Sequence, residues 1–308
     1  MNGKRVRAKV DGWVFLDKPV GPSSTQALGR VRRVFDAAKG GHAGTLDPLA
    51  SGLLPIALGE ATKTLAHFAD GTKEYEFTVR WGTATASDDA EGAVTATSPV
   101  RPTQASLAAV LPRFTGEIEQ VPPVYSAVKI DGERAYALAR AGETVAMKSR
   151  KVLIYNLEIV DMPGPDEARL RVSCGSGTYV RSLARDLALA LGTVGHVVAL
   201  RRTAVGKHRV EAAISLDNLE ALGHSPARFG ALAPVETVLD DIPALAVTAQ
   251  EAAALRQGRV LRDPRAEQPP PEPGPLAVFH DGKLVALAEG SGGEIRPARV
   301  FNLGSMKE

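Results

Sequence analysis

One acidic residue stands in the densest run of turn-forming residues in the chain, between residues 40 and 52. The run reads Gly-Gly-His-Ala-Gly-Thr-Leu-Asp-Pro-Leu-Ala-Ser-Gly, with His42 near its start and Asp47 directly before Pro48. Glycine permits tight turns, and a residue that precedes proline is held away from the helical region. The pattern predicts a rigid loop that presents one carboxylate to a cleft. An ordinary Asp-Pro turn, with the side chain bonded to local amides, is the structural alternative.

Predicted strands and helices on both sides must hold this loop. Residues 13–16 form a predicted strand, and residues 73–81 alternate, with Tyr75 and every second residue up to Trp81 apolar. A helix is predicted to begin after an N-cap at Ser24 and to end at Gly40-Gly41. Residues 53–58 are interpreted as a short strand or buried loop.

The second half of the chain repeats this mixture. Residues 152–160 and 169–174 are predicted to form a hairpin, residues 180–191 a helix, and residues 197–205 a strand. A further hairpin is predicted at residues 276–288, around Asp281-Gly282. The Pro/Glu-rich stretch 264–275 is interpreted as an exposed loop.

Composition excludes several classes of protein. The 308 residues suffice for two domains, and no apolar run approaches the ~18 residues of a membrane helix. The basic N-terminus has no apolar signal segment, so we expect a cytoplasmic protein. A single cysteine, Cys174, excludes an internal disulfide, and the histidines lack metal-ligand spacing.

The net charge of +2 conceals two strongly basic segments. Residues 1–40 hold nine Lys/Arg against three acids, and residues 171–209 hold seven against Asp186 alone. If the fold brings the two segments together, they form a positive face suited to a polyanion such as nucleic acid. Two separately solvated faces are the alternative.

The loop and its surroundings resemble the TruB family of tRNA pseudouridine synthases. The stretch that matches the catalytic motif of the family is His42–Pro55. Other matching stretches follow family order: Gly12–Ser24, Gly59–Lys63, Lys73–Tyr75, Pro122–Tyr136, Ser173–Leu187 and Gly195–Thr203. The resemblance covers about residues 12–205, and the C-terminal part more weakly resembles a small β-rich RNA-binding appendage of the PUA type.

This resemblance implies an α+β fold, with a mixed, largely antiparallel sheet, flanking helices and a central catalytic cleft. It implies a catalytic domain of residues 1–239 with a mobile RNA-clamping insertion at about 121–151. Residues 240–308 are then the PUA-like module.

The implied reaction is isomerisation of uridine 55 in the T loop of tRNA to pseudouridine. The N1–C1′ bond breaks, the base rotates while bound, and C5 bonds to C1′. No atom is gained or lost, so we expect no cofactor and no metal. A stacked uridine must first be flipped out of the loop.

The resemblance also assigns catalytic roles. Asp47 is the nucleophile or base, and an acylal at C1′ and a glycal route both stay open. Arg181 matches an arginine that pairs with this carboxylate and keeps it ionised; a surface helix arginine is the alternative. Tyr75 matches a tyrosine that stacks on the target base; ordinary core packing is the alternative.

The same match assigns substrate-binding positions. His42 is expected to hold flipped nucleotides, and Tyr179 and Leu200 to line the uracil pocket. Lys18 and Lys63 are expected to contact phosphate or position a loop. Asp88 and Asp89 match an acidic loop with a structural or positioning role.

The expected partner is the T-arm of tRNA, bound by a monomer, with no membrane and no protein partner. Two other functions stay open. A tRNA-folding chaperone would use the same basic surface. A hydrolase of the N-glycosidic bond would need a second carboxylate to activate water, and the loop at 40–52 holds none.

Overall fold

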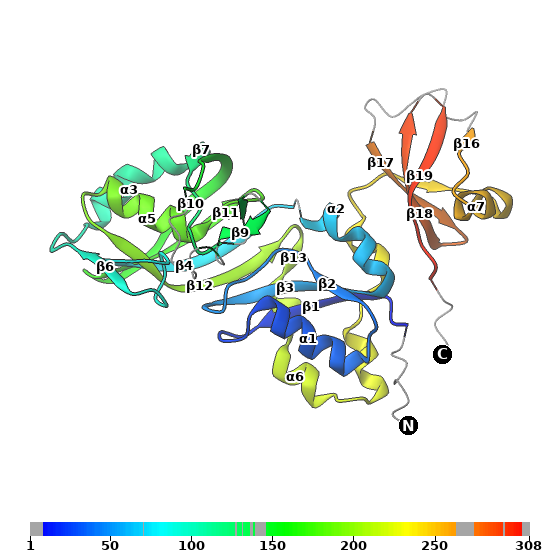
Figure 1. The fold of residues 1–308 in the computed structure, drawn as a ribbon, viewed down its shortest axis with the longest axis horizontal. Coiled ribbons are helices and arrows are strands. Elements are labelled where there is room, and N and C mark those ends of the chain that lie inside the picture. The colour runs from blue at the N-terminus through cyan, green and yellow to red at the C-terminus, as the bar shows by residue number, and fades with distance from the viewer. Residues whose placement is uncertain are drawn as a thin grey trace.

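A computed structural model describes residues 9–69, 71–126, 128–130, 132–135, 138, 146–262, 274–291 and 293–303. Ten strands form one large sheet: β1 (Gly12–Lys18), β2 (Gly40–His42), β3 (Ala50–Leu58), β4 (Lys73–Trp81), β7 (Gly116–Gln120), β10 (Arg150–Gly164), β11 (Glu167–Cys174), β12 (Gly195–Val205), β13 (His208–Arg209) and β14 (Ile214–Ser215). Their order is β14-β1-β3-β12-β4-β11-β10-β7, with β2 attached to β3 and β13 to β12 (Figure 1). Only β1–β14 and β3–β12 pair in parallel among these strands, which confirms the predicted mixed, largely antiparallel sheet.

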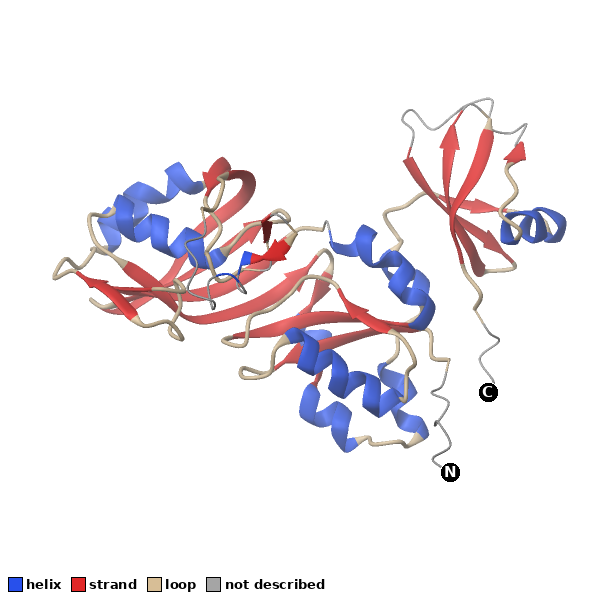
Figure 2. Ribbon diagram, in the orientation of Figure 1, coloured by secondary structure: helices blue, strands red, loops and turns tan. Residues whose placement is uncertain are grey.

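Helices flank this sheet, as Figure 2 shows. They are α1 (Ser24–Phe35), α2 (Leu65–Ala69), α3 (Gln104–Val110), α5 (Val180–Ala190) and α6 (Leu216–Ala221), with the 3-10 helices η1 (Gly59–Thr64), η2 (Leu111–Phe114), η3 (Val210–Ala212), η4 (Pro226–Ala231) and η5 (Val235–Val238). Two small hairpins stand outside the sheet: β5 (Thr83–Thr85) with β6 (Val94–Thr97), and β8 (Lys129–Ile130) with β9 (Glu133–Arg134).

The two faces of strand β1 contribute to two different cores. Val14 and Leu16 belong to a buried cluster that also contains side chains of α1, α5 and α6. Trp13 belongs to a second cluster, which includes η5 and residues of the C-terminal sheet. Because side chains alternate along a strand, β1 and its neighbour β3 are largely buried from both faces.

The structure corrects the predicted bounds of the first helix. Ser23, not Ser24, is the N-cap: its hydroxyl accepts from the N–H of Gln26, and the Gln26 side chain accepts from the N–H of Ser23. The helix ends at Phe35 rather than at Gly40-Gly41, because Asp36 adopts a left-handed conformation (φ 53°). Gly40 to His42 then form strand β2, and the next predicted strand begins earlier, at Ala50.

The other predicted elements that flank the site are confirmed in type. Residues 73–81 form β4 with alternating burial, the predicted hairpin is β10–β11, and the predicted second helix is α5. Parts of the predicted insertion at 121–151, and the predicted loop at 264–275 except its last two residues, lie outside the described residues.

A second sheet is built from the C-terminal residues. Its order is β15 (Ala244–Ala246), β17 (Gly274–His280), β18 (Lys283–Ser291), β19 (Glu294–Val300) and β16 (Leu261–Arg262), and α7 (Ala249–Arg256) packs on it. The predicted hairpin at Asp281-Gly282 joins β17 to β18. No described helix is long and apolar enough to cross a membrane.

Candidate active site

The loop between β2 and β3 is held from several sides. Three backbone N–H groups donate to backbone carbonyls here: Ala43 to that of Pro55 (2.9 Å), Ala50 to that of Asp47 (3.0 Å), and Gly21 to that of Pro48 (2.9 Å). Gly44 has a φ of 80°, a conformation that side chains other than glycine rarely adopt. These backbone bonds produce the rigid loop that the sequence predicts.

Two buried side chains fasten the loop to neighbouring elements. The Ser24 hydroxyl accepts from the N–H of Leu46 (2.7 Å) and donates to its carbonyl (2.8 Å). From the opposite element, the Arg202 guanidinium on β12 donates to the carbonyls of Leu53 (2.7 Å) and Gly44 (3.1 Å). The backbone on either side of Asp47 is therefore tied to α1 and to the centre of the sheet.

Asp47 forms an ion pair with Arg181 at the start of helix α5. Arg181 Nη2 lies 2.9 Å from Asp47 Oδ2, and Arg181 Nη1 lies 3.2 Å from Oδ2 of a second carboxylate, Asp89. The Arg181 side chain is only 5% exposed, whereas the Asp47 side chain is 37% exposed. One guanidinium thus holds two carboxylates that line the larger cavity, and Asp47 is the more exposed of the two.

Opposing influences act on the pKa of Asp47. Burial raises the pKa, and the charge of Asp89 adds to this rise. The charge and hydrogen bond of Arg181, and the charge of Lys18, lower it. Arg181 therefore favours the ionised carboxylate that a nucleophile or base requires.

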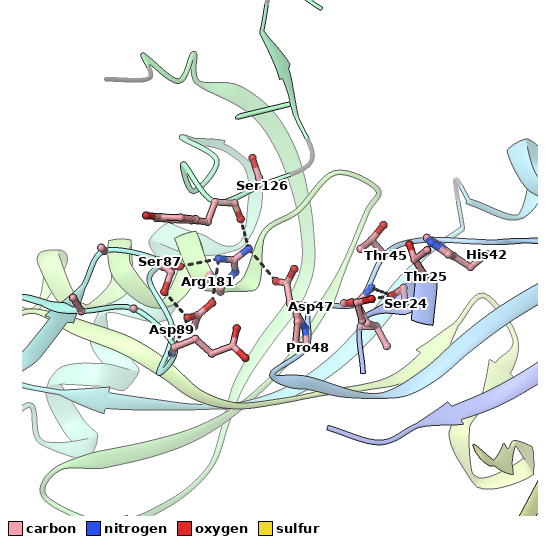
Figure 3. Close-up of a pocket in the computed structure, with 17 residues that line it drawn as sticks. Ser24, Thr25, His42, Thr45, Asp47, Pro48, Ser87, Asp89, Ser126 and Arg181 are labelled. Atoms are coloured by element: carbon pink, nitrogen blue, oxygen red, sulfur yellow. Dashed lines mark hydrogen bonds and ion pairs between the residues drawn. The ribbon is translucent and has the colours of Figure 1, made fainter. Parts of the chain in front are cut away.

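Two cavities share the wall that carries Asp47. The larger, of about 720 Å³, lies between Ser24 and His42 on one side and Ser87 and Asp89 on the other (Figure 3). The smaller, of about 290 Å³, is lined by Tyr75, Tyr179 and Leu200 among others. Thr45, Leu46, Asp47, Ser126 and Arg181 line both. Five of the predicted residues, Asp47, Arg181, Tyr75, Tyr179 and Leu200, therefore converge on the smaller cavity.

Tyr75 lies at the centre of the sheet, on β4 opposite Arg202 of β12. Burial raises the pKa of the Tyr75 phenol, and the charge of Arg202 and its hydrogen bond with the phenol oppose the rise. The ring belongs to the buried core and at the same time lines the cavity. The two interpretations of Tyr75, core packing and a cavity surface, are therefore compatible.

Lys18, His42 and Lys63 have different surroundings. His42 lines the larger cavity, its Nδ1 has no partner among the described residues, and burial lowers its pKa. Lys18 is buried and donates to the carbonyls of Pro19 and Pro22, so it positions a loop. Lys63 lines neither cavity; its ammonium donates to Glu60 (2.7 Å) and to the carbonyl of Val300 (2.6 Å) in β19.

Sequence reasoning missed three contributors to the site. Arg202 and Ser126 are not among the predicted site residues, and Ser24 is predicted only as a helix cap. Arg202 follows Leu200 by two residues on one strand, so the alternation of side chains was the available signal. Asp89 was assigned a structural or positioning role, and its bonds to Arg181, Ser87 and the N–H of Glu91 fit that role.

The second basic segment, residues 171–209, does not form a free positive surface in the folded chain. Six of its seven cations pair with carboxylates: Arg171 with Glu76 and Glu158, Arg181 with Asp47 and Asp89, Arg185 with Asp88 and Asp186, Arg201 with Asp17, Lys207 with Asp240 and Arg209 with Glu74. All but one of these acids come from outside the segment. The local excess of charge is therefore largely neutralised by the fold.

Family models match this chain over nearly its whole length. The models described as TruB family pseudouridylate synthase (N terminal domain), tRNA pseudouridylate synthase B C-terminal domain and tRNA pseudouridine synthase II, C terminal match residues 32–180, 181–240 and 242–302. The protein called tRNA pseudouridine synthase B from Bradyrhizobium diazoefficiens is 55% identical over 97% of this chain and 88% of its own length. The chain belongs to the TruB family of pseudouridylate synthases.

Other comparisons agree with TruB membership. A relative of the same name from Rhodospirillum rubrum is 53% identical, covering 98% of this chain and all of its own. Among solved structures, an H/ACA RNP bound to a substrate RNA containing 2′-deoxyuridine gives a TM-score of 0.71 at 24% identity, covering 95% of this chain and 85% of the other. A Cbf5-Nop10-Gar1 complex gives 0.70 at 24% identity over 94% of this TruB chain and 84% of the other. These two structures share the fold and confirm the expected pseudouridine synthase architecture.

Proposed function

We propose that this chain isomerises uridine 55 in the T loop of tRNA to pseudouridine. The observation that carries the proposal is the position of Asp47. Its carboxylate is ion-paired to Arg181 on the wall that two cavities share, one of them lined by Tyr75, Tyr179 and Leu200. A single reactive carboxylate beside an aromatic cavity suits chemistry at C1′ of a flipped nucleotide.

The reaction needs one bond to break and another to form. In one route the Asp47 carboxylate attacks C1′, N1 of the uracil leaves with the bonding electrons, and an acylal forms. In the other, Asp47 removes a ribose proton and a glycal forms as N1 leaves. The uracil then rotates and C5 bonds to C1′, while the Asp47–C1′ bond breaks in the first route or the removed proton returns to the ribose C2′ in the second. The proton on C5 is lost and N1 gains one, so the composition is unchanged.

The surrounding residues support these steps. Tyr75 offers a ring face for stacking, an interaction that tolerates rotation of the base because it carries little directional hydrogen bonding. Arg181 orients Asp47 and favours its ionised form, against the burial that raises the pKa of this carboxyl. Tyr179 and Leu200 enclose the base, and His42 faces the larger cavity where neighbouring nucleotides of the loop would lie.

The same proposal covers organisation and setting. Residues 1–239 form the catalytic domain, residues 121–151 clamp the T-arm, and residues 240–308 form an accessory RNA-binding module. The protein is proposed to act on tRNA in the cytoplasm as a monomer.

Treatment of unmodified tRNA with the wild-type protein and with Asp47→Asn tests the proposal. The substitution keeps the shape of the side chain and removes the charge, so we expect pseudouridine at position 55 with the wild type and none above background with the variant. Single-turnover reactions followed by mass spectrometry locate the product. Full activity of Asp47→Asn contradicts the role of Asp47.

The same experiment separates the other functions. Release of free uracil would identify a hydrolase of the N-glycosidic bond. That function would draw on Asp89 as a second carboxylate, but its oxygens are already bonded to Ser87, Glu91 and Arg181. Rescue of tRNA folding by Asp47→Asn would reveal a chaperone role in addition to the isomerisation.

A further inference from the structure

Ser126 is a buried serine on the wall where the two cavities meet. The residue is 5% exposed and, together with Asp47 and Arg181, lines both cavities. Figure 3 places it on the Arg181 side of the pocket, away from Ser24, Thr25 and His42. The backbone N–H of Ser126 donates to the carbonyl of Val124 at 2.9 Å, which fixes the segment locally.

The hydroxyl of Ser126 has no hydrogen-bond partner in the part of the chain that the structure describes. A buried hydroxyl without a partner costs about 1–3 kcal/mol, so such groups are rare and need an explanation. The other buried serine of the wall, Ser24, uses its hydroxyl twice, as donor and as acceptor. Ser126 is therefore a polar group left unsatisfied within the site.

The neighbouring polar groups are already engaged. The carbonyl of Tyr125 accepts from Arg181 Nη2 at 2.8 Å, and the carbonyl of Ser87 accepts from Arg181 Nη1 at 2.8 Å. The carboxylate of Asp47 pairs with the same guanidinium. No described group bonds to the Ser126 hydroxyl, and a group that enters either cavity can supply its partner.

We infer that Ser126 Oγ hydrogen-bonds to a sugar–phosphate oxygen of the target nucleotide. The inference rests on the proposed function. Asp47 acts at the ribose, the base enters the cavity of Tyr75, and the adjoining nucleotides occupy the larger cavity. The sugar–phosphate of the target nucleotide joins these two spaces, and Ser126 lines both.

The substitution Ser126→Ala tests this inference. The hydroxyl makes no hydrogen bond to any described residue, so the melting temperature should stay the same or rise. The kcat/KM for a T-arm RNA hairpin should fall about tenfold, because the complex loses one hydrogen bond. Ser98→Ala is the control: its hydroxyl accepts from the N–H of Val100 in an exposed loop, and it lines neither cavity.

A second RNA locates the oxygen. The affinity of each protein is measured for a hairpin with 2′-deoxyuridine at the target position. If Ser126→Ala no longer weakens binding to this hairpin, the partner is the ribose 2′-hydroxyl. If the loss persists, another oxygen of the sugar–phosphate is the partner, and the inference stands.

Two results would overturn the inference. One is a Ser126→Ala protein whose kcat/KM and affinity lie within twofold of the wild type. The other is a marked fall in its melting temperature, which would mean that the hydroxyl serves the free protein. Failure of the wild type itself to form pseudouridine would instead reject the proposed function.

Discussion

Two buried cations without carboxylate partners among the described residues surround the Asp47 loop. Arg202 is 1% exposed and donates to backbone carbonyls, and Lys18 is fully buried and does the same. Burying a charge is costly unless it is compensated. The charge of Lys18 lowers the pKa of the Asp47 carboxyl, and so partly offsets the burial that raises this pKa above its ordinary value.

Lys18 gives the protein a specific dependence on pH. Burial, the largest influence, lowers its pKa from 10.5 to about 8, while Asp47 acts in the opposite direction. Between those two values the unfolded chain binds more protons than the folded protein, so the stability contributed by Lys18 rises with pH. Below about pH 8 both states carry the charge, and the cost of burying it is constant.

Lys18→Met should therefore change the pH profile of stability. As pH rises from 7 to 10.5, the wild type should gain up to about 3 kcal/mol of unfolding free energy relative to the variant, at about 1.4 kcal/mol per unit of pKa. Denaturant unfolding at several pH values measures the difference. A constant difference across this range would mean that the ammonium keeps its ordinary pKa.

At the residue scale, motif resemblance located the groups that must perform chemistry. Asp47, Tyr75, Tyr179, Arg181 and Leu200 come from four separate segments and share one cavity. The motif resemblance did not locate residues that support the site through hydrogen bonds to backbone carbonyls. The partners of Arg202 lie about 150 residues away in sequence, and no local pattern specifies such distant pairs.

At the scale of elements, helix α1 and strand β12 hold the catalytic loop between them. Ser23 supplies the cap of α1, which leaves the hydroxyl of Ser24 available to bind Leu46. Two adjacent serines at a helix start have equal capping propensity, so the sequence could not decide between them. Likewise, Gly40-Gly41 resembles a helix stop, but pairing with β3 makes it a strand.

Ser24→Ala should slow the reaction more than it weakens RNA binding. The substitution leaves the N–H and carbonyl of Leu46 without their buried partner, at a cost of about 1–3 kcal/mol. Because Leu46 adjoins Asp47, we expect kcat to fall about tenfold and KM for the T-arm hairpin to stay within about threefold. Steady-state kinetics and thermal unfolding measure both effects.

Ser23→Ala controls for the loss of stability. It removes the cap of the same helix at a cost of about 1 kcal/mol, without touching Leu46. If Ser23→Ala and Ser24→Ala have the same kcat, once each is corrected for the fraction of protein that is folded, Ser24 does not position the loop.

At the scale of the whole molecule, the C-terminal sheet is joined to the catalytic part by specific bonds. In η1, the Lys63 ammonium donates to the carbonyl of Val300, and the Glu60 carboxylate accepts from the N–H of Asn302. Phe301 is buried in the second core cluster, which also contains Trp13. The sequence indicated two units, but it did not show that Lys63 serves their junction. The partners stand about 240 residues apart, so only the folded chain brings them together.

Charge also has to be judged on the folded molecule. Arg171 is paired with Glu76 and Glu158 on an exposed face of the sheet, at 2.8 and 2.9 Å. Arg150 has no carboxylate partner among the described residues; it lines the smaller cavity, donates to Gly177, and lies 4.6 Å from the centre of the Tyr179 ring. These two arginines are equal in formal charge but differ in their availability to a phosphate.

RNA affinity should fall steeply with salt, and the two arginines should contribute unequally to the slope. If Arg150 neutralises one phosphate, Arg150→Gln should reduce the slope of log K against log salt concentration by about 1, because fewer counterions are released on binding. Arg171→Gln should leave the slope unchanged, since its charge is already balanced. Titration of a labelled T-arm hairpin at several salt concentrations measures both slopes.

An equal reduction of the slope by both substitutions would mean that the ion pairs of Arg171 with Glu76 and Glu158 open when RNA binds. An affinity of the wild type that does not change with salt would contradict any electrostatic contribution to binding.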